Sequence, residues 1–268
     1  MTVVRTDYSS LATPALIDLL FQDEDRVPVA HIDEITRRGP SLIPLLREIL
    51  CCDDYWYEGQ RGEFWIELHT VTILSRLGDP VILNDLVPRI LTSCFADYDW
   101  LTERWADVFA GFGVAAVDPL LAMLNQHRGA FRDGTDYSAA RIEAVRSLAF
   151  IAFDHAEAYP KVVGWYKEQL CDPAEDDREM LTAIAAPLLL LADRNTSASR
   201  TEKAAGAEAL RTALRRGAID TAQTGALTEM VRAANSTASN RYFRRWLHQF
   251  HTPEQIAFRA GHWATADP

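Results

Sequence analysis

The 268-residue chain lacks a long apolar run, because its longest, Ala183–Ala192, is far shorter than the ~18 to 20 residues of a membrane span. Its N-terminal stretch carries Asp7 and Asp18 and has no apolar segment of the kind that a secretion signal needs. The four cysteines form no C-x-x-C pair, which argues against a disulfide framework. We therefore expect a cytoplasmic protein that makes no contact with membranes.

The motifs of several enzyme classes are also missing. There is no phosphate-binding G-x-x-x-x-G-K-[ST], no dinucleotide-binding G-x-G-x-x-G, no G-x-S-x-G nucleophile turn and no H-E-x-x-H zinc motif. No alternating pattern of useful length predicts a strand either. These absences favour a helical, non-enzymatic protein without a cofactor.

Charge is unevenly distributed along the chain. Residues 1–178 hold 30 Asp and Glu against 16 Lys and Arg, whereas residues 179–268 hold 8 against 11. A negative field disfavours nucleic acid, whose phosphates must be met by Lys and Arg, and favours a basic protein partner. The basic end could also dock on the acidic end of a second copy, which would give a homo-oligomer.

A helical motif recurs in the first two-thirds of the chain. It consists of an apolar helix that ends at glycine, a tight turn, and a second apolar helix with proline in its first half. The corner glycines Gly39, Gly78 and Gly113 are 39 and 35 residues apart, a spacing typical of stacked helix pairs. Capping signals and periodicity predict a first helix at 13–22 and pairs at 28–38 with 40–52, 63–77 with 80–94, 100–112 with 114–127, 137–153 with 155–170, and within 176–216. Further helices are expected at 220–235 and 252–261.

The string Leu77-Gly78-Asp79-Pro80, followed by a proline-bearing apolar helix, resembles HEAT-like repeats of the type first noted in phycobilisome lyases. The resemblance implies an all-α protein: one α-solenoid domain over 1–268, with about six antiparallel helix pairs and terminal capping helices. It covers 28–170 clearly, and 171–268 as degenerate pairs with a C-terminal cap. Such arrays mostly bind other macromolecules along their second helices. Iron hydroxylases built on HEAT-like repeats use His-Glu dipeptides, and this chain has none.

Acidic and aromatic residues recur where the second helices end. The candidate partner-binding residues are Asp53, Asp54, Tyr55, Trp56, Asp97, Tyr98, Trp100, Asp133, Asp136 and Tyr137. The three Asp-Tyr pairs are 43 and 39 residues apart, so stacking would bring them to one exposed edge. Carboxylates among aromatic rings suit the capture of Arg and Lys. A structural reading stays open, in which Asp caps the next helix and the rings fill grooves between repeats.

Two other functions remain as alternatives. Asp53, Asp54 and Glu58 resemble the first Mg²⁺-binding motif of class I terpene synthases, although the second motif fails because Asn84-Asp85 is not followed by the required Ser and Glu. The segment 240–251 mixes arginines with aromatic rings and could bind single-stranded nucleic acid. Its Phe243, Leu247 and Phe250 nevertheless have the spacing of an ordinary helical core stripe.

Overall fold

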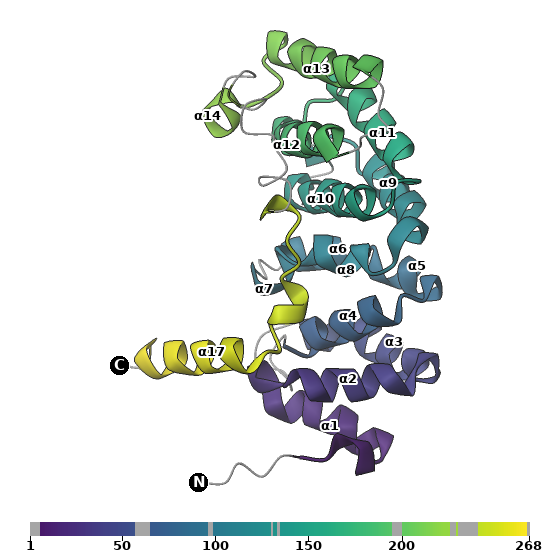
Figure 1. Ribbon diagram of the computed structural model, residues 1–268, viewed down its shortest axis with the longest axis vertical. Helices are drawn as coiled ribbons and strands as arrows, with labels where there is room; N and C mark the ends of the chain where they lie inside the picture. The colour runs from purple at the N-terminus through teal and green to yellow at the C-terminus, as the bar shows by residue number, and fades with distance from the viewer. Residues whose placement is uncertain are drawn as a thin grey trace. The chain divides into compact units, whose positions relative to one another are not determined.

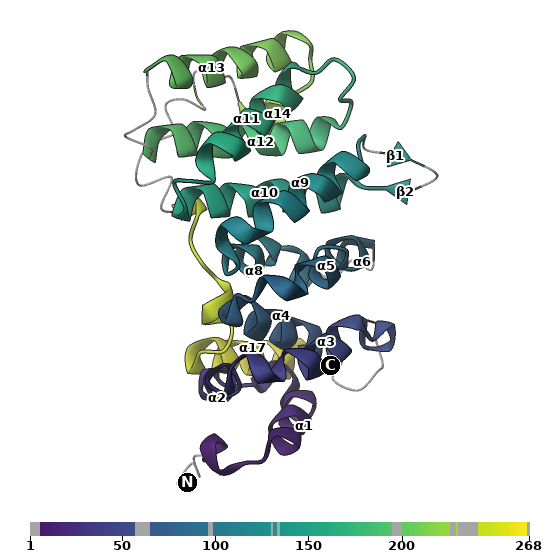
Figure 2. The same cartoon turned by 90° about the vertical axis from the view of Figure 1, so that its right-hand side faces the viewer.

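The computed structural model describes residues 6–56, 65–95, 99–129, 131–132, 135–194, 200–225, 229 and 241–266. Within these ranges the chain is almost entirely helical (Figure 1). The only sheet there is an antiparallel pair of two-residue strands, β1 (Phe131–Arg132) and β2 (Thr135–Asp136), seen in Figure 2. The prediction of an all-α protein is therefore confirmed. No helix in the described part is long and apolar enough to cross a membrane.

The chain divides into two compact units, one formed by residues 1–86 with 245–268 and the other by 87–244. The boundary falls where the sequence predicted a continuous helix over 80–94. That helix is instead split into η5 (Pro80–Ile82), α5 (Leu83–Leu86) and α6 (Arg89–Phe95). Pro88 explains the break, because proline has no N–H to donate and its ring clashes with the preceding turn.

The first unit consists mainly of short helices that pack as antiparallel neighbours. Its other elements are η1 (Tyr8–Ser10), α1 (Thr13–Asp23), η2 (Glu24–Arg26), α2 (Val29–Arg38), η3 (Pro40–Leu42), α3 (Ile43–Cys51), η4 (Asp53–Trp56), α4 (Trp65–Leu77), η7 (Leu247–Gln249) and α17 (Pro253–Ala266). α4 packs against α1, α2 and α3, and α3 packs against α5. α4 is buried over most of its length and forms the core of the unit.

The second unit has two layers of longer helices. Its other elements are α7 (Asp99–Thr102), α8 (Trp105–Ala110), η6 (Gly113–Ala116), α9 (Val117–Gln126), α10 (Ser138–Asp154), α11 (Tyr159–Cys171), α12 (Arg178–Arg194), α13 (Arg200–Arg215) and α14 (Thr221–Thr224). α10 lies between α8 and α12, while α11 packs against α13 (Figures 1 and 2). Within this unit α8, α10 and α12 thus follow one another in one layer, and α11 and α13 lie in the other.

The glycine corners have the conformation that the sequence predicted. Gly39, Gly78 and Gly113 have φ values of 80°, 63° and 57°, a region that side chains with a Cβ rarely adopt. The amide of Gly78 donates to the Leu74 carbonyl at 3.0 Å and that of Gly39 to Thr36 at 2.9 Å. These bonds close the exposed ends of the first helices.

Two predictions on the later helices need correction. α14 starts after Asp220, whose side chain accepts from the Ala222 amide as expected, but it ends at Thr224 rather than near residue 235. The reason is Gly225, which has a φ of 69° and terminates the helix. α17 starts at the predicted place but continues through Gly261 to Ala266, because glycine in a helix only weakens it. Phe243, Leu247 and Phe250 are buried as expected, but they do not form a stripe on one helix: residues 244–246 are not helical, and Phe243 belongs to the second unit whereas Leu247 and Phe250 belong to the first.

Candidate partner-binding surface

The acidic turn that follows α3 is built on two aromatic side chains. Trp56 is completely buried, and its indole N–H donates to the Leu50 carbonyl at 3.1 Å, which closes the C-terminal end of α3. Tyr55 is half-buried, with its ring centroid 5.1 Å from that of Phe21. The expectation that Trp56 belongs to an exposed edge is therefore wrong. Its large apolar ring is a core residue of the first unit.

Asp53 and Asp54 begin the same turn and are exposed. They lie next to the C-terminal end of α3, where the helix dipole disfavours negative charge. The two carboxylates therefore do not stabilise α3 electrostatically. They are held at the surface by the two buried or half-buried rings that follow them.

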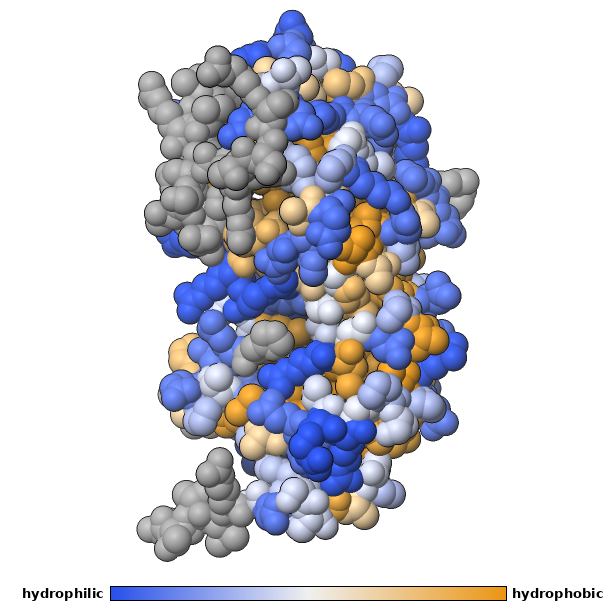
Figure 3. Space-filling model, turned by 45° about the vertical axis from the view of Figure 1, so that its right-hand side comes forward, coloured by the Kyte–Doolittle hydropathy of each residue, from blue (hydrophilic) through white to orange (hydrophobic). Residues whose placement is uncertain are grey.

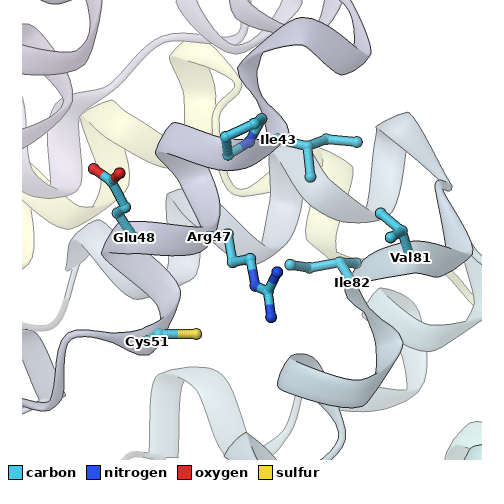
Figure 4. A pocket seen from close by; sticks show the side chains of 7 residues that line it. Ile43, Arg47, Glu48, Cys51, Val81 and Ile82 are labelled. Atoms are coloured by element: carbon cyan, nitrogen blue, oxygen red, sulfur yellow. The ribbon is translucent and has the colours of Figure 1, made fainter.

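Beside this turn, a groove of about 560 Å³ runs between α3 and η5. It is lined by Ile43, Pro44, Arg47, Glu48, Cys51, Val81 and Ile82 (Figure 4). Its side walls are mainly aliphatic, and Val81 is 62% exposed. An exposed apolar side chain in a concave site is a feature of binding surfaces, whereas isolated exposed side chains on flat surface are common.

One arginine in the groove is neutralised within the unit. Arg47 extends from α3 toward η5, and its Nε and Nη2 lie 2.8 and 3.0 Å from the two carboxylate oxygens of Asp85. The hydrogen bond and charge of Asp85 raise the pKa of Arg47, so the guanidinium stays charged. Glu48 follows Arg47, is exposed, and its side chain extends away from the arginine. The groove thus combines aliphatic walls with a margin that carries negative charge.

The Asp-Tyr pair of the second unit has a structural role. Asp136 is exposed, but its Oδ1 accepts from the amide of Ser138, the first residue of α10, at 2.9 Å, and so satisfies a free N–H at the start of the helix, where Tyr137 occupies the N-cap position. Tyr137 is half-buried, with its ring 4.6 Å from that of His127. Of the two readings that the sequence left open, capping and packing describe this corner.

The side chains of several candidate residues are not among those that the structure describes. Asp97, Tyr98 and Asp133 lie outside the described residues, as does Glu58 of the diphosphate-enzyme motif. Trp100 lies in α7, but its side chain is not described. Because Asp53 and Asp136 belong to different units, a common edge for the recurring pairs stays a prediction. Among the described residues, no group of three or more His, Cys, Asp or Glu is placed to hold a metal ion.

The sequence did not reveal a buried ionic cluster in the second unit. Arg141 of α10 is completely buried, and its Nη1 donates to Asp177 Oδ2 at 2.7 Å while Nη2 donates to Glu175 Oε2 at 2.6 Å. Asp177 also accepts from the Met180 amide at 2.9 Å, so it caps α12. The guanidinium thereby ties α10 to the start of α12 through two buried carboxylates.

A second buried acid lies further along α10. Glu143 is 4% exposed and accepts from Arg146 Nη1 at 2.5 Å. Burial raises the pKa of Glu143 to about 7, although the nearby Arg146 lowers it. This carboxyl therefore gains a proton near neutral pH, unlike an ordinary glutamate.

Three histidines of the first unit, His31, His69 and His251, are completely buried. One ring nitrogen of each histidine donates a hydrogen bond to a backbone carbonyl: His31 to Leu16 at 2.9 Å, His69 to Glu24 at 2.7 Å, and His251 to Val27 at 3.0 Å. No local signal marks them, because the residues they meet are brought together only by tertiary packing.

Comparison with known proteins adds no family to this description, because no family model, curated protein or solved structure matches the chain. The class of surface is therefore defined by geometry: an apolar groove between α3 and η5, with the exposed carboxylate of Glu48 in its lining and those of Asp53 and Asp54 in the turn that follows α3. The residues that define it are Glu48, Asp53, Asp54, Val81 and Ile82.

Proposed function

We propose that the protein is a non-enzymatic α-solenoid of HEAT-like helix pairs that binds a basic segment of another protein at the α3–η5 groove. The observation that carries the proposal is the combination of aliphatic groove walls with the exposed carboxylates of Glu48, Asp53 and Asp54. Residues 1–86, which contain the groove, hold 15 Asp and Glu against seven Lys and Arg. A basic partner is therefore attracted before contact is made.

The position of the groove supports a macromolecular ligand. It lies between the second helices of successive pairs, which are the helices that solenoid proteins commonly use for binding. On the face drawn in Figure 3, hydrophobic residues form separate patches among hydrophilic ones. A partner that meets such a surface gains affinity from a few apolar anchors and specificity from charge.

The partner chemistry follows from the groove lining. Val81 and Ile82 offer contact to an aliphatic or aromatic side chain, while Arg47 is already paired with Asp85. The carboxylates of Glu48, Asp53 and Asp54 belong to α3 and the turn that follows it, and they suit Lys or Arg next to that anchor. The proposed ligand is therefore an apolar side chain flanked by basic residues.

The diphosphate-enzyme alternative gains no comparable support. Such an enzyme needs several carboxylates converging on a closed apolar pocket to hold Mg²⁺. Asp53 and Asp54 are exposed on a turn, and Glu48 is the only carboxylate that lines the described groove.

Fluorescein-labelled 12-residue peptides provide a direct test. One series places Leu or Phe among Lys and Arg, and a matched series replaces the basic residues by Glu. We expect anisotropy titrations to detect binding of the basic series alone, with affinity that falls as salt rises. Equal binding of both series, or of neither, would contradict the proposal.

Two variants separate binding from folding. Asp53→Asn with Asp54→Asn should change the free energy of unfolding by less than about 0.5 kcal/mol, but weaken peptide binding and flatten its salt dependence. The matched control, Asp136→Asn, removes a carboxylate from the other unit but keeps a side-chain oxygen that can accept from the Ser138 amide, so it should also change the free energy of unfolding by less than about 0.5 kcal/mol. It should leave peptide affinity unchanged.

A further inference from the structure

The C-terminal segment of the first unit is fastened to the N-terminal helices by backbone hydrogen bonds. His251 Nδ1 donates to the Val27 carbonyl at 3.0 Å, and the Val29 amide donates to the His251 carbonyl at 2.9 Å. The first of these bonds joins residues 224 positions apart in sequence, and the second joins His251 to the residue two positions after Val27. The segment therefore closes the unit from the opposite end of the chain.

An arginine adds a second attachment nearby. Arg259 is 4% exposed, and its Nη2 donates to the Asp25 carbonyl at 2.6 Å and to the Phe250 carbonyl at 2.9 Å. The guanidinium also lies 3.7 Å from the centre of the Phe250 ring. Beyond this contact α17 extends away from the other helices of the unit, and Phe258 is exposed (Figure 1).

Two further buried histidines lie in the same unit, and one of them, His69, lies under this segment. His69 lies 5.1 Å from His251, measured between ring centroids, and Phe250 packs over Trp65 at 5.7 Å. His31 is stacked on Tyr8 at 4.7 Å. Since both His31 and His69 use Nε2 to donate to a carbonyl, Nδ1 is the nitrogen left to accept a proton.

Neither of these nitrogens faces a group that could accept a hydrogen bond from it after it has bound a proton. Nδ1 of His31 and Nδ1 of His69 are buried without a hydrogen-bond partner. Burial lowers the pKa of His69 well below its usual value, and the nearby His251, His31 and Arg259 lower it further, against a rise from the bond to Glu24. Burial also lowers the pKa of His31. A proton on either ring creates both a buried charge and an unpaired donor.

We propose that residues 245–266 form an acid-released clasp, which lies on η2, the Val27–Val29 segment and α4 while His69 beneath it is neutral, and detaches when a proton from solvent binds this ring. Detachment lets the new N–H and charge reach water. Residues 87–244 have their own core and stay folded. The inference is independent of the groove, because it concerns a different set of residues.

The other charged and titratable groups near the histidine rings do not remove the sensitivity of the clasp to acid. They are Tyr8 of η1, Asp23 of α1, Glu24 and Asp25 of η2, Glu67 of α4 and Arg259 of α17. The charge of Asp23 favours a proton on His31, but less than burial opposes it. Asp25 lies 3.7 Å from Arg259 Nε, so its carboxylate already faces a cation.

Amide hydrogen exchange of the full chain tests the clasp. Between pH 7 and pH 5.5, after correction for intrinsic exchange, protection of Val29 and of residues 253–262 should fall at least about tenfold, since each proton taken up changes the opening constant tenfold per pH unit. Amides at 145–151 in α10 should keep their protection. Equal loss in both regions, or no loss in either, would overturn the proposal.

Two variants identify the proton acceptor. His69→Gln keeps a donor near the bonded nitrogen but cannot be protonated, so it should lose most of the pH dependence. If it does not fold, His69→Asn, which carries the same donor on a shorter side chain, should show a shallower slope than the wild type. His155→Gln, in the other unit, is the control and should behave as the wild type. An unchanged slope in a folded His69 variant would exclude this histidine as the acceptor.

Discussion

The two units bury polar groups in contrasting ways. In the first, histidines that are neutral when buried donate to backbone carbonyls, as His69 does to Glu24. In the second, the permanent charge of Arg141 is matched by the carboxylates of Glu175 and Asp177. A neutral pair loses a hydrogen bond when one partner is removed, whereas an ionic cluster is left with uncompensated charge. The units should therefore differ in sensitivity both to substitution and to pH.

The largest effect is expected in the ionic cluster. Arg141→Met leaves two buried carboxylates without their cation and should lower the free energy of unfolding by about 3 to 5 kcal/mol, as measured by urea denaturation. The control is Lys161→Met, which removes an exposed ion pair with Asp118 and should cost less than about 1 kcal/mol. A similar loss of unfolding free energy in the two variants would show that the buried ionic cluster is no more sensitive to substitution than an exposed ion pair.

Glu143 provides the next test, and its pH dependence has the opposite sign to that of the histidines. Its folded pKa of about 7 exceeds the usual 4.5, so the native state holds an extra proton between these values. The stability of the wild type should thus fall as pH rises through that window, by at most about 3 kcal/mol. Urea titrations of Glu143→Gln from pH 5 to pH 8 should show that this contribution is gone. If the unfolding free energy of Glu143→Gln changed with pH in parallel with that of the wild type, Glu143 would not be the group that takes up the proton.

Removal of a histidine from the first unit should have a smaller and pH-dependent cost. His69→Ala leaves the Glu24 carbonyl unsatisfied and should lower the free energy of unfolding by about 2 kcal/mol at pH 7.5. The lowered pKa means that wild-type His69 stabilises the fold above its unfolded value of about 6.5 and loses this contribution as pH falls. The difference between variant and wild type should therefore shrink by up to about 1.4 kcal/mol at pH 5.5. A difference that grows on acidification would exclude a neutral histidine.

The smallest effect concerns the glycine corners. Gly39→Val should cost about 1 kcal/mol in thermal unfolding, because φ is 80° there although no atom lies within 4 Å of the added Cβ. The corner at Gly113 is tighter, since a Cβ would meet His155 Nε2 at 3.0 Å, so Gly113→Val should cost more. Gly164→Ala, inside α11 and in open space, should instead stabilise the protein slightly. An equal loss of stability at Gly39 and Gly113 would show that backbone strain alone, and not the contact with His155, determines the effect of the substitution.

The sequence predicted the features that depend on neighbouring residues. Gly39, Gly78 and Gly113 adopt the left-handed region, and the Gln255 amide donates to the Thr252 hydroxyl at the predicted start of α17. These signals act within one helical turn, so a single sequence contains them. The same locality explains why Asp136 fits the capping interpretation.

Features that depend on distant packing were not predictable in this way. Trp56 was expected at the surface, but whether an aromatic residue after a helix is buried depends on the fit of the neighbouring helices. His251 meets Val27 across 224 positions, and no periodicity connects them. The groove between α3 and η5 likewise becomes visible only when the two second helices are placed together.

The clasp also has a consequence for the order in which the protein folds during synthesis. The first unit combines residues 1–86 with 245–268, so the ribosome makes the entire second unit before it reaches the segment that completes the first. At 5 to 20 residues per second, residues 87–244 take on the order of ten to thirty seconds to emerge. During that interval the Val27 carbonyl and the His69 ring lack the neighbours that later cover them. The second unit is therefore complete first, and the beginning of the chain is the last part to reach its native structure.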